Sequence, residues 1–344
     1  MIDSSLSQAE EAQLKYVSDD IDGIKRFKSD KSFIFLGSKA EKIKDRRTIE
    51  RINSLAIPPA WKNVWISPFA NSHLQATGFD EKGRKQYRYH PKWIEATQQN
   101  KFDKMLFFGK TLPTLRRKIR QDMGKNGLSI EKIIATVVWL LEHTFIRVGN
   151  SEYAKENNSF GLTTLRNKHV KVRGSNIKFQ FKGKSGVMHS VQISDKRIAG
   201  IIKRCIELPG FELFQYVDQD GEIKIIDSAD VNDYLKAVTG EEITAKEFRT
   251  WGGTVLSATT LHQLGDFDSD GVKASNIKQT IKVVASHLRN TPKVCLQYYI
   301  HPTVINTYEK KLLVPFFNTT KTKLTPELTI NEFKVMNLLQ KYPV

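Results

Sequence analysis

The pattern of apolar and polar residues divides the chain into a first part rich in strands and a longer helical part. Residues 57–89 are rich in aromatic and β-branched residues, and turn formers such as DEKG at positions 80–83 interrupt them, which is typical of a small β module. Residues 24–53 indicate a strand followed by a charged helix that leads into this module. Bulky apolar residues then alternate with Lys and Arg at helical spacing over 92–126.

A buried helix and a β-hairpin are the clearest elements of the second part. Apolar residues recur at helical spacing over 130–145, and Ser129 is placed to cap this helix. The period changes to two over 169–193, where the apolar and polar residues of IKFQFK (177–182) face opposite sides, as in a half-buried strand. Lys184 therefore lies at the tip of a hairpin. The remainder is predicted to be mostly helical, with loops at QDGE, DFDSDG and LRNTP.

These patterns predict an α+β fold with two domains. We expect a small β-rich N-terminal domain over residues 1–97 and a larger, mostly helical domain with a β-hairpin over residues 98–344. The polar stretch EATQQNKFD marks the boundary. A length of 344 residues suits about two domains, and a hydrophobic content of 40% is enough to fill their cores.

The net charge of the chain indicates the kind of partner that it binds. The chain has 54 Lys+Arg and 37 Asp+Glu, a formal charge of +17. A folded protein with this surplus most often binds a polyanion, and nucleic acid is the commonest, although heparin-like chains and anionic lipids share the signature. Two cysteines, Cys205 and Cys295, are too few for a disulfide framework. The polar N-terminus and the absence of a long apolar run predict a soluble, cytoplasmic protein.

Five polar residues stand in segments that core packing does not explain. They are Arg147 in IRVGN, Lys184 in FKGKSG, Arg249 in FRTWGG, and Asn290 and Tyr299 in LRNTPKVCLQYYIHP. Each has an ordinary explanation when taken singly, as a solvated charge, a turn lysine or a half-buried tyrosine. Together they form a far more specific pattern.

The order and surroundings of these segments resemble the type IB DNA topoisomerases, in particular their poxvirus-like and bacterial branch, which share a catalytic domain with the tyrosine recombinases. The resemblance runs from IPPAWKNVWISP at residue 57 through HLQATGFDEKGRKQYRYHPKW to NTPKVCLQYYIHP at residue 302. It implies a tyrosine nucleophile a few residues after the Thr291-Pro292 pair, which is Tyr299. The neighbouring Tyr298 is the alternative, and on a helix it would point about 100° away.

The resemblance also implies a role for each of the other four residues. Arg147 and Arg249 would clamp the scissile phosphate as bidentate forks, because its oxygens gain charge in the transition state. Asn290 would be a third donor; the poxvirus enzymes have histidine there, and an amide donates a hydrogen bond but cannot shuttle a proton. Lys184 would protonate the leaving 5′ oxygen, with Lys182 as the alternative.

A basic and aromatic strand, GRKQYRYH, is expected to contact DNA. As a strand it places Gln86 on one face and Lys85, Tyr87 and Tyr89 on the other. By resemblance Gln86, Tyr87 and Tyr89 contact the duplex, the glutamine at a base edge, and Lys85 adds charge. The alternative is that the two tyrosines pack under the β module.

The sequence thus predicts a monomer that closes around double-stranded DNA in the cytoplasm, associated with the nucleoid. It would relax positive and negative supercoils through a 3′-phosphotyrosine at Tyr299, without ATP, metal or other cofactor. The alternatives are a tyrosine site-specific recombinase and an inactive DNA-binding protein of the same fold. The acidic stretch at residues 266–271 imitates the start of a calcium loop, but Ile277 stands where the last carboxylate ligand belongs, so it is predicted to be a polar loop.

Overall fold

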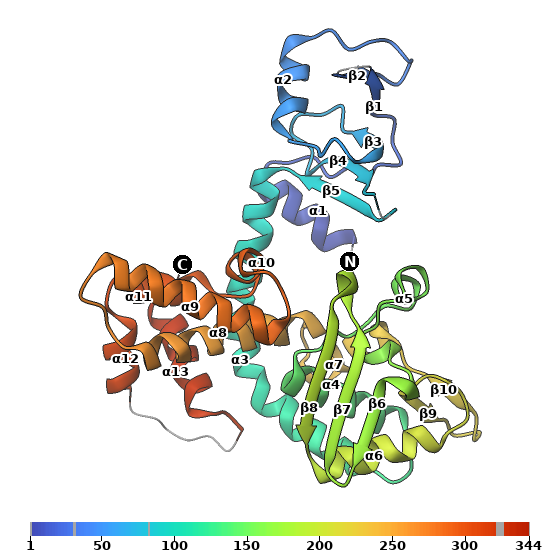
Figure 1. The fold of residues 1–344 in the computed structure, drawn as a ribbon, viewed down its shortest axis with the longest axis vertical. Helices are drawn as coiled ribbons and strands as arrows, with labels where there is room; N and C mark the ends of the chain where they lie inside the picture. Colours follow the sequence, from blue (N-terminus) through green and yellow to red (C-terminus); the bar gives the residue numbers. More distant parts are fainter. Residues whose placement is uncertain (1, 30–31, 82, 321–326, 344) are drawn as a thin grey trace. The chain divides into compact units, whose positions relative to one another are not determined.

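A computed structural model describes residues 2–29, 32–81, 83–320 and 327–343 (Figure 1). The chain forms two compact units, Met1–Asp103 and Lys104–Val344. Strands dominate the first unit and helices the second, so the predicted α+β class is confirmed. The boundary expected between residues 97 and 98 lies inside helix α3 (Pro91–Met123), which begins in the first unit and ends in the second.

The first unit is built on a five-stranded antiparallel sheet in the order β2-β1-β3-β4-β5. Its elements are α1 (Ile2–Glu11), β1 (Ile24–Ser29), β2 (Ser32–Leu36), α2 (Arg46–Ser54), β3 (Lys62–Ile66), β4 (Leu74–Phe79) and β5 (Lys85–Tyr89). One face of the sheet buries apolar residues of β1 to β4 against Ile52 of α2. The charged helix α2 begins where Asp45 accepts a hydrogen bond from the Thr48 N–H.

Two details of this unit bear on the predictions. The single strand expected at the start of residues 24–53 is wrong, because two antiparallel strands, β1 and β2, are present and pair with each other. The turn expected in DEKG is confirmed: the Gly83 N–H donates to the Asp80 carbonyl (2.9 Å) between β4 and β5.

The second unit is mostly helical and contains a three-stranded antiparallel sheet, β6-β7-β8, and a two-stranded one, β9-β10. Its elements after α3 are α4 (Ile130–Thr144), α5 (Ser151–Asn157), η1 (Leu162–Thr164), η2 (Asn167–His169), β6 (Val170–Arg173), β7 (Asn176–Lys182), η3 (Lys184–Gly186), β8 (Met188–Ser194), α6 (Lys196–Glu207), β9 (Gln215–Val217), β10 (Ile223–Ile225), α7 (Ser228–Thr239), α8 (Ala245–Leu264), α9 (Asp270–Leu288), α10 (Pro292–Tyr298), α11 (Pro302–Glu309), α12 (Leu313–Thr319) and α13 (Ile330–Lys341).

Local patterns predicted much of this unit. Helix α4 is capped by Ser129, and its apolar face is buried in the core. Residues of β7 alternate between exposed and buried along its whole length, which confirms the predicted hairpin strand. The loop expected at QDGE is confirmed; it joins β9 and β10, a hairpin that was not predicted because its strands are too short for their alternation to stand out. The helices expected after residue 302 are present as α11 to α13.

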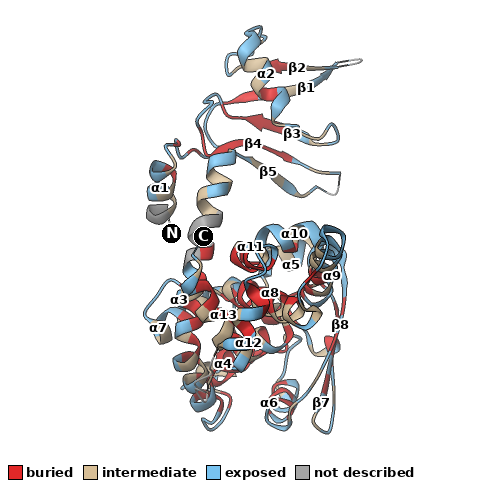
Figure 2. Cartoon of the chain, turned by 90° about the vertical axis from the view of Figure 1, so that its left-hand side faces the viewer, coloured by how far each residue is buried: buried red, intermediate tan, exposed pale blue. Residues whose placement is uncertain are grey.

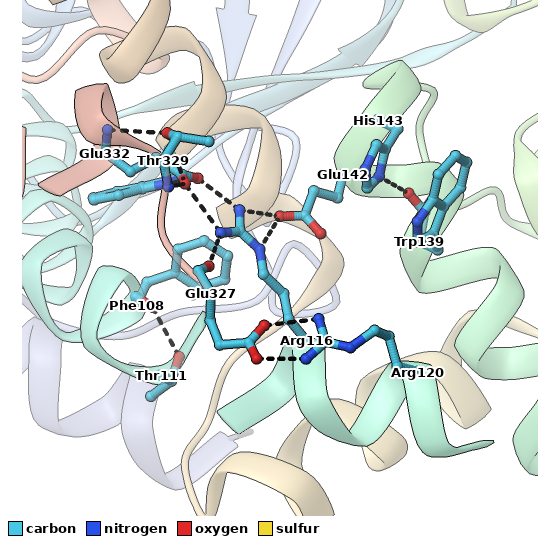
Figure 3. A network of polar contacts seen from close by, with 11 residues as sticks. Phe108, Thr111, Arg116, Arg120, Trp139, Glu142, His143, Glu327, Thr329 and Glu332 are labelled. Carbon is cyan, nitrogen blue, oxygen red and sulfur yellow. Dashed lines mark hydrogen bonds and ion pairs between the residues drawn. The ribbon is translucent and has the colours of Figure 1, made fainter. Parts of the chain in front are cut away.

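Buried residues run along β3 and β4 in the first unit and along α8 in the second (Figure 2). An ion-pair network helps to hold the helices around α8 (Figure 3). Arg116 of α3 pairs with Glu142 of α4 and with Glu332 of α13, its Nη1 lying 3.0 Å from Glu332 Oε2. Glu332 also accepts a hydrogen bond from the Trp251 indole of α8 (3.1 Å). The C-terminal helix is therefore joined to α8, which carries Arg249.

Candidate active site

Arg147 lies just beyond the end of helix α4. The helix stops at Thr144 because Phe145 takes a left-handed backbone conformation (φ 53°), and the Phe145 N–H donates to the Leu141 carbonyl. Two residues later, Arg147 Nη2 donates a hydrogen bond to Asn290 Oδ1 (2.7 Å). Two of the five predicted residues, 143 positions apart, are thus in direct contact.

Arg249 lies in the first part of α8 and is only 3% exposed. Its Nη1 donates to the Phe145 carbonyl, and its Nη2 donates to the Leu288 carbonyl (2.7 Å), so it joins the ends of α4 and α9. Burial, and then the charge of Arg147, lowers the pKa of the Arg249 guanidinium to about 10, which leaves it charged at neutral pH. Each Nη atom carries two N–H donors, so the two carbonyl contacts leave donors on Arg249 for a phosphate, and its buried Nε has no hydrogen-bond partner among the described residues.

Tyr299 is the residue at which helix α10 ends. Thr291 caps the start of this helix and Pro292 follows in its first turn, while the Tyr299 N–H donates to the Cys295 carbonyl (2.9 Å). The Tyr299 ring lies over Arg249, with 5.2 Å between its centroid and Arg249 Cζ. Burial raises the pKa of the Tyr299 phenol, but the charges of Arg249 and Arg147 outweigh it, and the pKa lies below its ordinary value. The phenolate is the stronger nucleophile, so this placement suits a nucleophilic tyrosine.

The neighbouring Tyr298 has a different environment. It is 36% exposed, whereas Tyr299 is half-buried and packs against the core. Helix α8 approaches the Tyr299 backbone closely, because a Cβ at Gly253 would lie 2.6 Å from the Tyr299 carbonyl oxygen. These contacts favour Tyr299 over Tyr298 as the nucleophile.

Unpaired nitrogen atoms gather around this arginine pair. Asn290 Nδ2 is buried and has no hydrogen-bond partner among the described residues, although Asn290 Oδ1 is held by Arg147. Both ring nitrogens of His189, on β8, are also buried without a described partner. Buried polar groups are normally paired, so the open Asn290 amide donor beside two cations suits the binding of an anion.

Lys184 lies on the turn between β7 and β8. The turn is closed by the Gly183 N–H, which donates to the Val187 carbonyl (2.8 Å). The Lys184 side chain is exposed and makes no hydrogen bond or ion pair with any described residue. The structure therefore brings Arg147, Asn290, Arg249 and Tyr299 together and leaves Lys184 on an exposed turn, as Lys182 is also left exposed.

The predicted DNA-contacting residues lie on β5 in the first unit. Lys85 pairs with Asp19 (2.6 Å), and Gln86 Nε2 donates to Asp80 Oδ2 (3.1 Å) on the other face of the strand. The Tyr87 and Tyr89 rings stack 6.0 Å apart and are 46% and 39% exposed, so they do not pack under the β module. An exposed stacked pair beside a lysine suits contact with a nucleic acid.

Sequence analysis missed two residues of this site. His189 is a polar residue at an inward position of a strand whose other inward residues are apolar, and this break in the alternation was the available signal. Gly253 had no local signal, because its importance comes from the close approach of Tyr299. His301 caps the start of α11, where its ring accepts a hydrogen bond from the Thr303 N–H (3.2 Å). Cys295 is buried in the core.

Comparisons with known proteins show the family of the chain. The model of the eukaryotic DNA topoisomerase I catalytic core matches residues 90–323, and the model of the bacterial DNA topoisomerase IB N-terminal domain matches residues 32–80. The chain is 34% identical over 297 residues to the DNA topoisomerase 1B of Acanthamoeba polyphaga mimivirus, covering 84% of this chain and 88% of that protein. The chain belongs to the type IB DNA topoisomerase family.

A more distant relative is also a topoisomerase. The DNA topoisomerase 1B of vaccinia virus (strain Copenhagen) is 23% identical over 247 residues, which cover 70% of this chain and 74% of the viral protein. Membership of the type IB family confirms the predicted enzyme class, an isomerase of the DNA topoisomerase type.

The described residues show neither a metal-binding cluster nor a membrane-spanning helix. No group of three or more His, Cys, Asp or Glu side chains among them is arranged to hold a metal ion. The acidic stretch that imitates a calcium loop contains the start of α9, where Ser269 is the cap and Asp270 pairs with Lys273 (2.7 Å). None of the described helices combines the length and apolar character needed to cross a bilayer.

Proposed function

We propose that this type IB enzyme relaxes duplex DNA by cutting one strand transiently, with Tyr299 as the nucleophile. The observation that carries the proposal is the placement of the Tyr299 ring over the buried Arg249, beside the hydrogen-bonded Arg147 and Asn290. A phenolate beside two fixed cations can attack a phosphodiester that the same cations attract.

The proposed reaction has two steps, cleavage of one strand and its resealing. The Tyr299 phenol loses its proton to water, its oxygen attacks phosphorus, and the bond from phosphorus to the 5′ oxygen breaks. Lys184 gives the leaving 5′ oxygen a proton, which leaves a 3′-phosphotyrosine and a free 5′-hydroxyl. The 5′-hydroxyl attacks the phosphotyrosine in the reverse step. Because the ester to Tyr299 keeps the bond energy of the phosphodiester, resealing needs no ATP.

The charged groups have distinct roles in this scheme. Arg147, Arg249 and the open amide of Asn290 stabilise the charge that develops on the phosphate oxygens. Lys184 is on an exposed turn, so DNA must be present before its ammonium reaches the leaving oxygen. No step in this scheme uses a metal ion, because arginines supply the positive charge.

The remaining surplus of positive charge would hold the duplex. Lys85, Tyr87 and Tyr89 on one face of β5, and Gln86 on the other, are the proposed contacts of the first unit. We propose that a single chain closes around double-stranded DNA, with cations distributed over both units to neutralise phosphates. A cytoplasmic, nucleoid-associated location follows from this substrate and stays a prediction.

One experiment tests the nucleophile and the activity together. Supercoiled plasmid is incubated with the purified chain in EDTA, and the topoisomers are separated on a gel. The wild-type chain and Tyr298→Phe should relax the plasmid, and Tyr299→Phe should not. Relaxation by Tyr299→Phe would disprove the assignment. Strand exchange between two duplexes would indicate a recombinase, and absence of a covalent adduct on denaturing gels would indicate an inactive DNA-binding protein.

A further inference from the structure

His189 is buried beneath the turn that carries Lys184. It lies on β8, is 3% exposed, and stacks on the ring of Phe181 with 4.8 Å between the ring centroids. Neither of its ring nitrogens has a hydrogen-bond partner among the described residues. A buried imidazole without partners destabilises the fold and therefore requires an explanation.

The imidazole packs directly against the residue that precedes Lys184. A Cβ at Gly183 would lie 2.5 Å from His189 Nε2, so the close contact leaves room only for glycine. The same turn is closed by the Gly186 N–H, which donates to the Gly183 carbonyl (3.0 Å). His189 is thus the side chain on which the start of the Lys184 turn rests.

The surroundings keep this imidazole neutral. Burial, and then the charges of Arg289, Arg147 and Arg249, lower the pKa of His189 to about 4. Arg289 also ties the end of α9 to β8, because its Nη2 donates to the Ser190 carbonyl (3.0 Å). A neutral imidazole has one donor nitrogen and one acceptor nitrogen, whereas arginine and lysine side chains have donors only. The acceptor nitrogen therefore suits a cationic donor.

Lys184 is a nearby cation that no described residue pairs with. Its ammonium makes no hydrogen bond with a described residue, and it follows directly on the glycine that touches the imidazole. We propose that His189 is a positioning residue for Lys184: a nitrogen of the neutral imidazole accepts a hydrogen bond from the Lys184 ammonium in the DNA-bound enzyme. This inference rests on the proposed function, in which Lys184 is the proton donor.

The consequence is orientation of the proton that Lys184 delivers. An ammonium has three N–H bonds, and holding one on His189 leaves another directed at the leaving 5′ oxygen. No proton passes to the imidazole. After Lys184 has given its proton to the 5′ oxygen, the amine takes another from water.

The first test compares variants that keep or remove the acceptor. Single-turnover formation of the covalent adduct is measured on a duplex whose short 5′ fragment dissociates after cleavage. His189→Phe keeps the ring packing and removes the acceptor, and the rate constant should fall on the order of 10- to 100-fold. His189→Gln retains an acceptor and should recover most of the rate. His169→Asn, at a second buried histidine, keeps the acceptor for the Arg166 N–H and should react as the wild type does.

The second test identifies the affected step. The 5′ oxygen at the cleavage position is replaced by sulfur, because a thiolate leaves without protonation. On this substrate His189→Phe and Lys184→Ala should both react at the wild-type rate. The proposal is overturned if His189→Phe cleaves the ordinary duplex as fast as the wild type, or if its deficit persists with sulfur.

A second variant, Gly183→Ala, tests the same contact without changing the histidine. If thermal unfolding shows that His189→Phe does not fold, Gly183→Ala replaces it, since its Cβ pushes the Lys184 turn off an intact imidazole; it should show the same deficit and the same recovery with sulfur. An unaffected Gly183→Ala would contradict the proposal. Failure of the proposed function is distinct, because the wild type would then form no adduct at Tyr299.

Discussion

The close approach of helix α8 to Tyr299, the proposed nucleophile, predicts that one added methyl group will disable the enzyme. A Cβ added at Gly253 would lie 2.6 Å from the Tyr299 carbonyl oxygen and 3.3 Å from Tyr299 Cβ. Ordinary contacts begin at 3.4 Å, so Gly253→Ala must move Tyr299 away from α8 by about 0.8 Å. The backbone of Tyr299 cannot move as freely as the end of a flexible side chain. Two residues later, the His301 N–H donates to the Thr254 hydroxyl and the His301 ring accepts from the Thr303 N–H, which fixes this segment.

The expected loss follows from this displacement. A misplacement of about 1 Å costs on the order of 100-fold in rate when it moves a reacting atom. Gly253→Ala should therefore lower the single-turnover rate of adduct formation about 100-fold. DNA affinity should not change, because no charge is altered. The helix itself should tolerate alanine, which is favoured over glycine by about 1 kcal/mol in a helix interior.

A second glycine provides the matched control. Gly200 is exposed within helix α6, and a Cβ there would meet no atom within 4 Å. Gly200→Ala should raise the free energy of unfolding by up to about 1 kcal/mol and leave cleavage unchanged. If Gly253→Ala forms the adduct within about threefold of the wild-type rate while folded, the contact does not position the nucleophile and the reasoning is refuted.

Three other outcomes follow from the structure. Arg116→Met leaves Glu142 and Glu332 without their shared cation, and should lower the free energy of unfolding in urea by about 3–5 kcal/mol; a loss below about 1 kcal/mol would contradict this. The pKa of His189 is lowered to about 4 in the folded chain. Between about pH 6.5 and pH 4 the imidazole is therefore protonated in the unfolded chain and neutral in the folded one. The free energy of unfolding should fall as the pH falls, by at most about 1.4 kcal/mol per pH unit at this site. That dependence, measured by urea unfolding, should be weaker in His189→Phe, and an equal slope would argue against a neutral buried imidazole. Lys85→Gln should lower the slope of DNA binding against salt by one unit or less, since Asp19 already pairs with Lys85; a slope unchanged in a filter-binding titration would remove Lys85 from the interface.

Local sequence patterns predicted most of the elements. The spacing of apolar residues and the Ser129 cap predicted helix α4, and strict alternation predicted β7, because helix and strand faces follow from neighbouring residues alone. The patterns failed where elements are short. Each strand of the β9-β10 hairpin has three residues, which are too few for a period to show.

The sequence predicted which residues form the candidate site, and the structure shows how they are arranged. The motifs named Arg147, Lys184, Arg249, Asn290 and Tyr299, and resemblance assigned their roles. The resemblance favoured Tyr299, with the adjacent Tyr298 as the alternative. Only tertiary packing shows that the Tyr299 ring is half-buried over Arg249 whereas Tyr298 is exposed.

The sequence by itself determined the fold class, the charge surplus, the family and the identity of the chemical groups, since each is a property of composition or of neighbouring residues. Tertiary structure alone decided that the Arg249 Nη atoms donate to the carbonyls of Phe145 and Leu288, and that His189 lies under the Lys184 turn without a hydrogen-bond partner among the described residues. These contacts join residues far apart in the chain. Their geometry depends on how helices and sheet pack, which no local periodicity records.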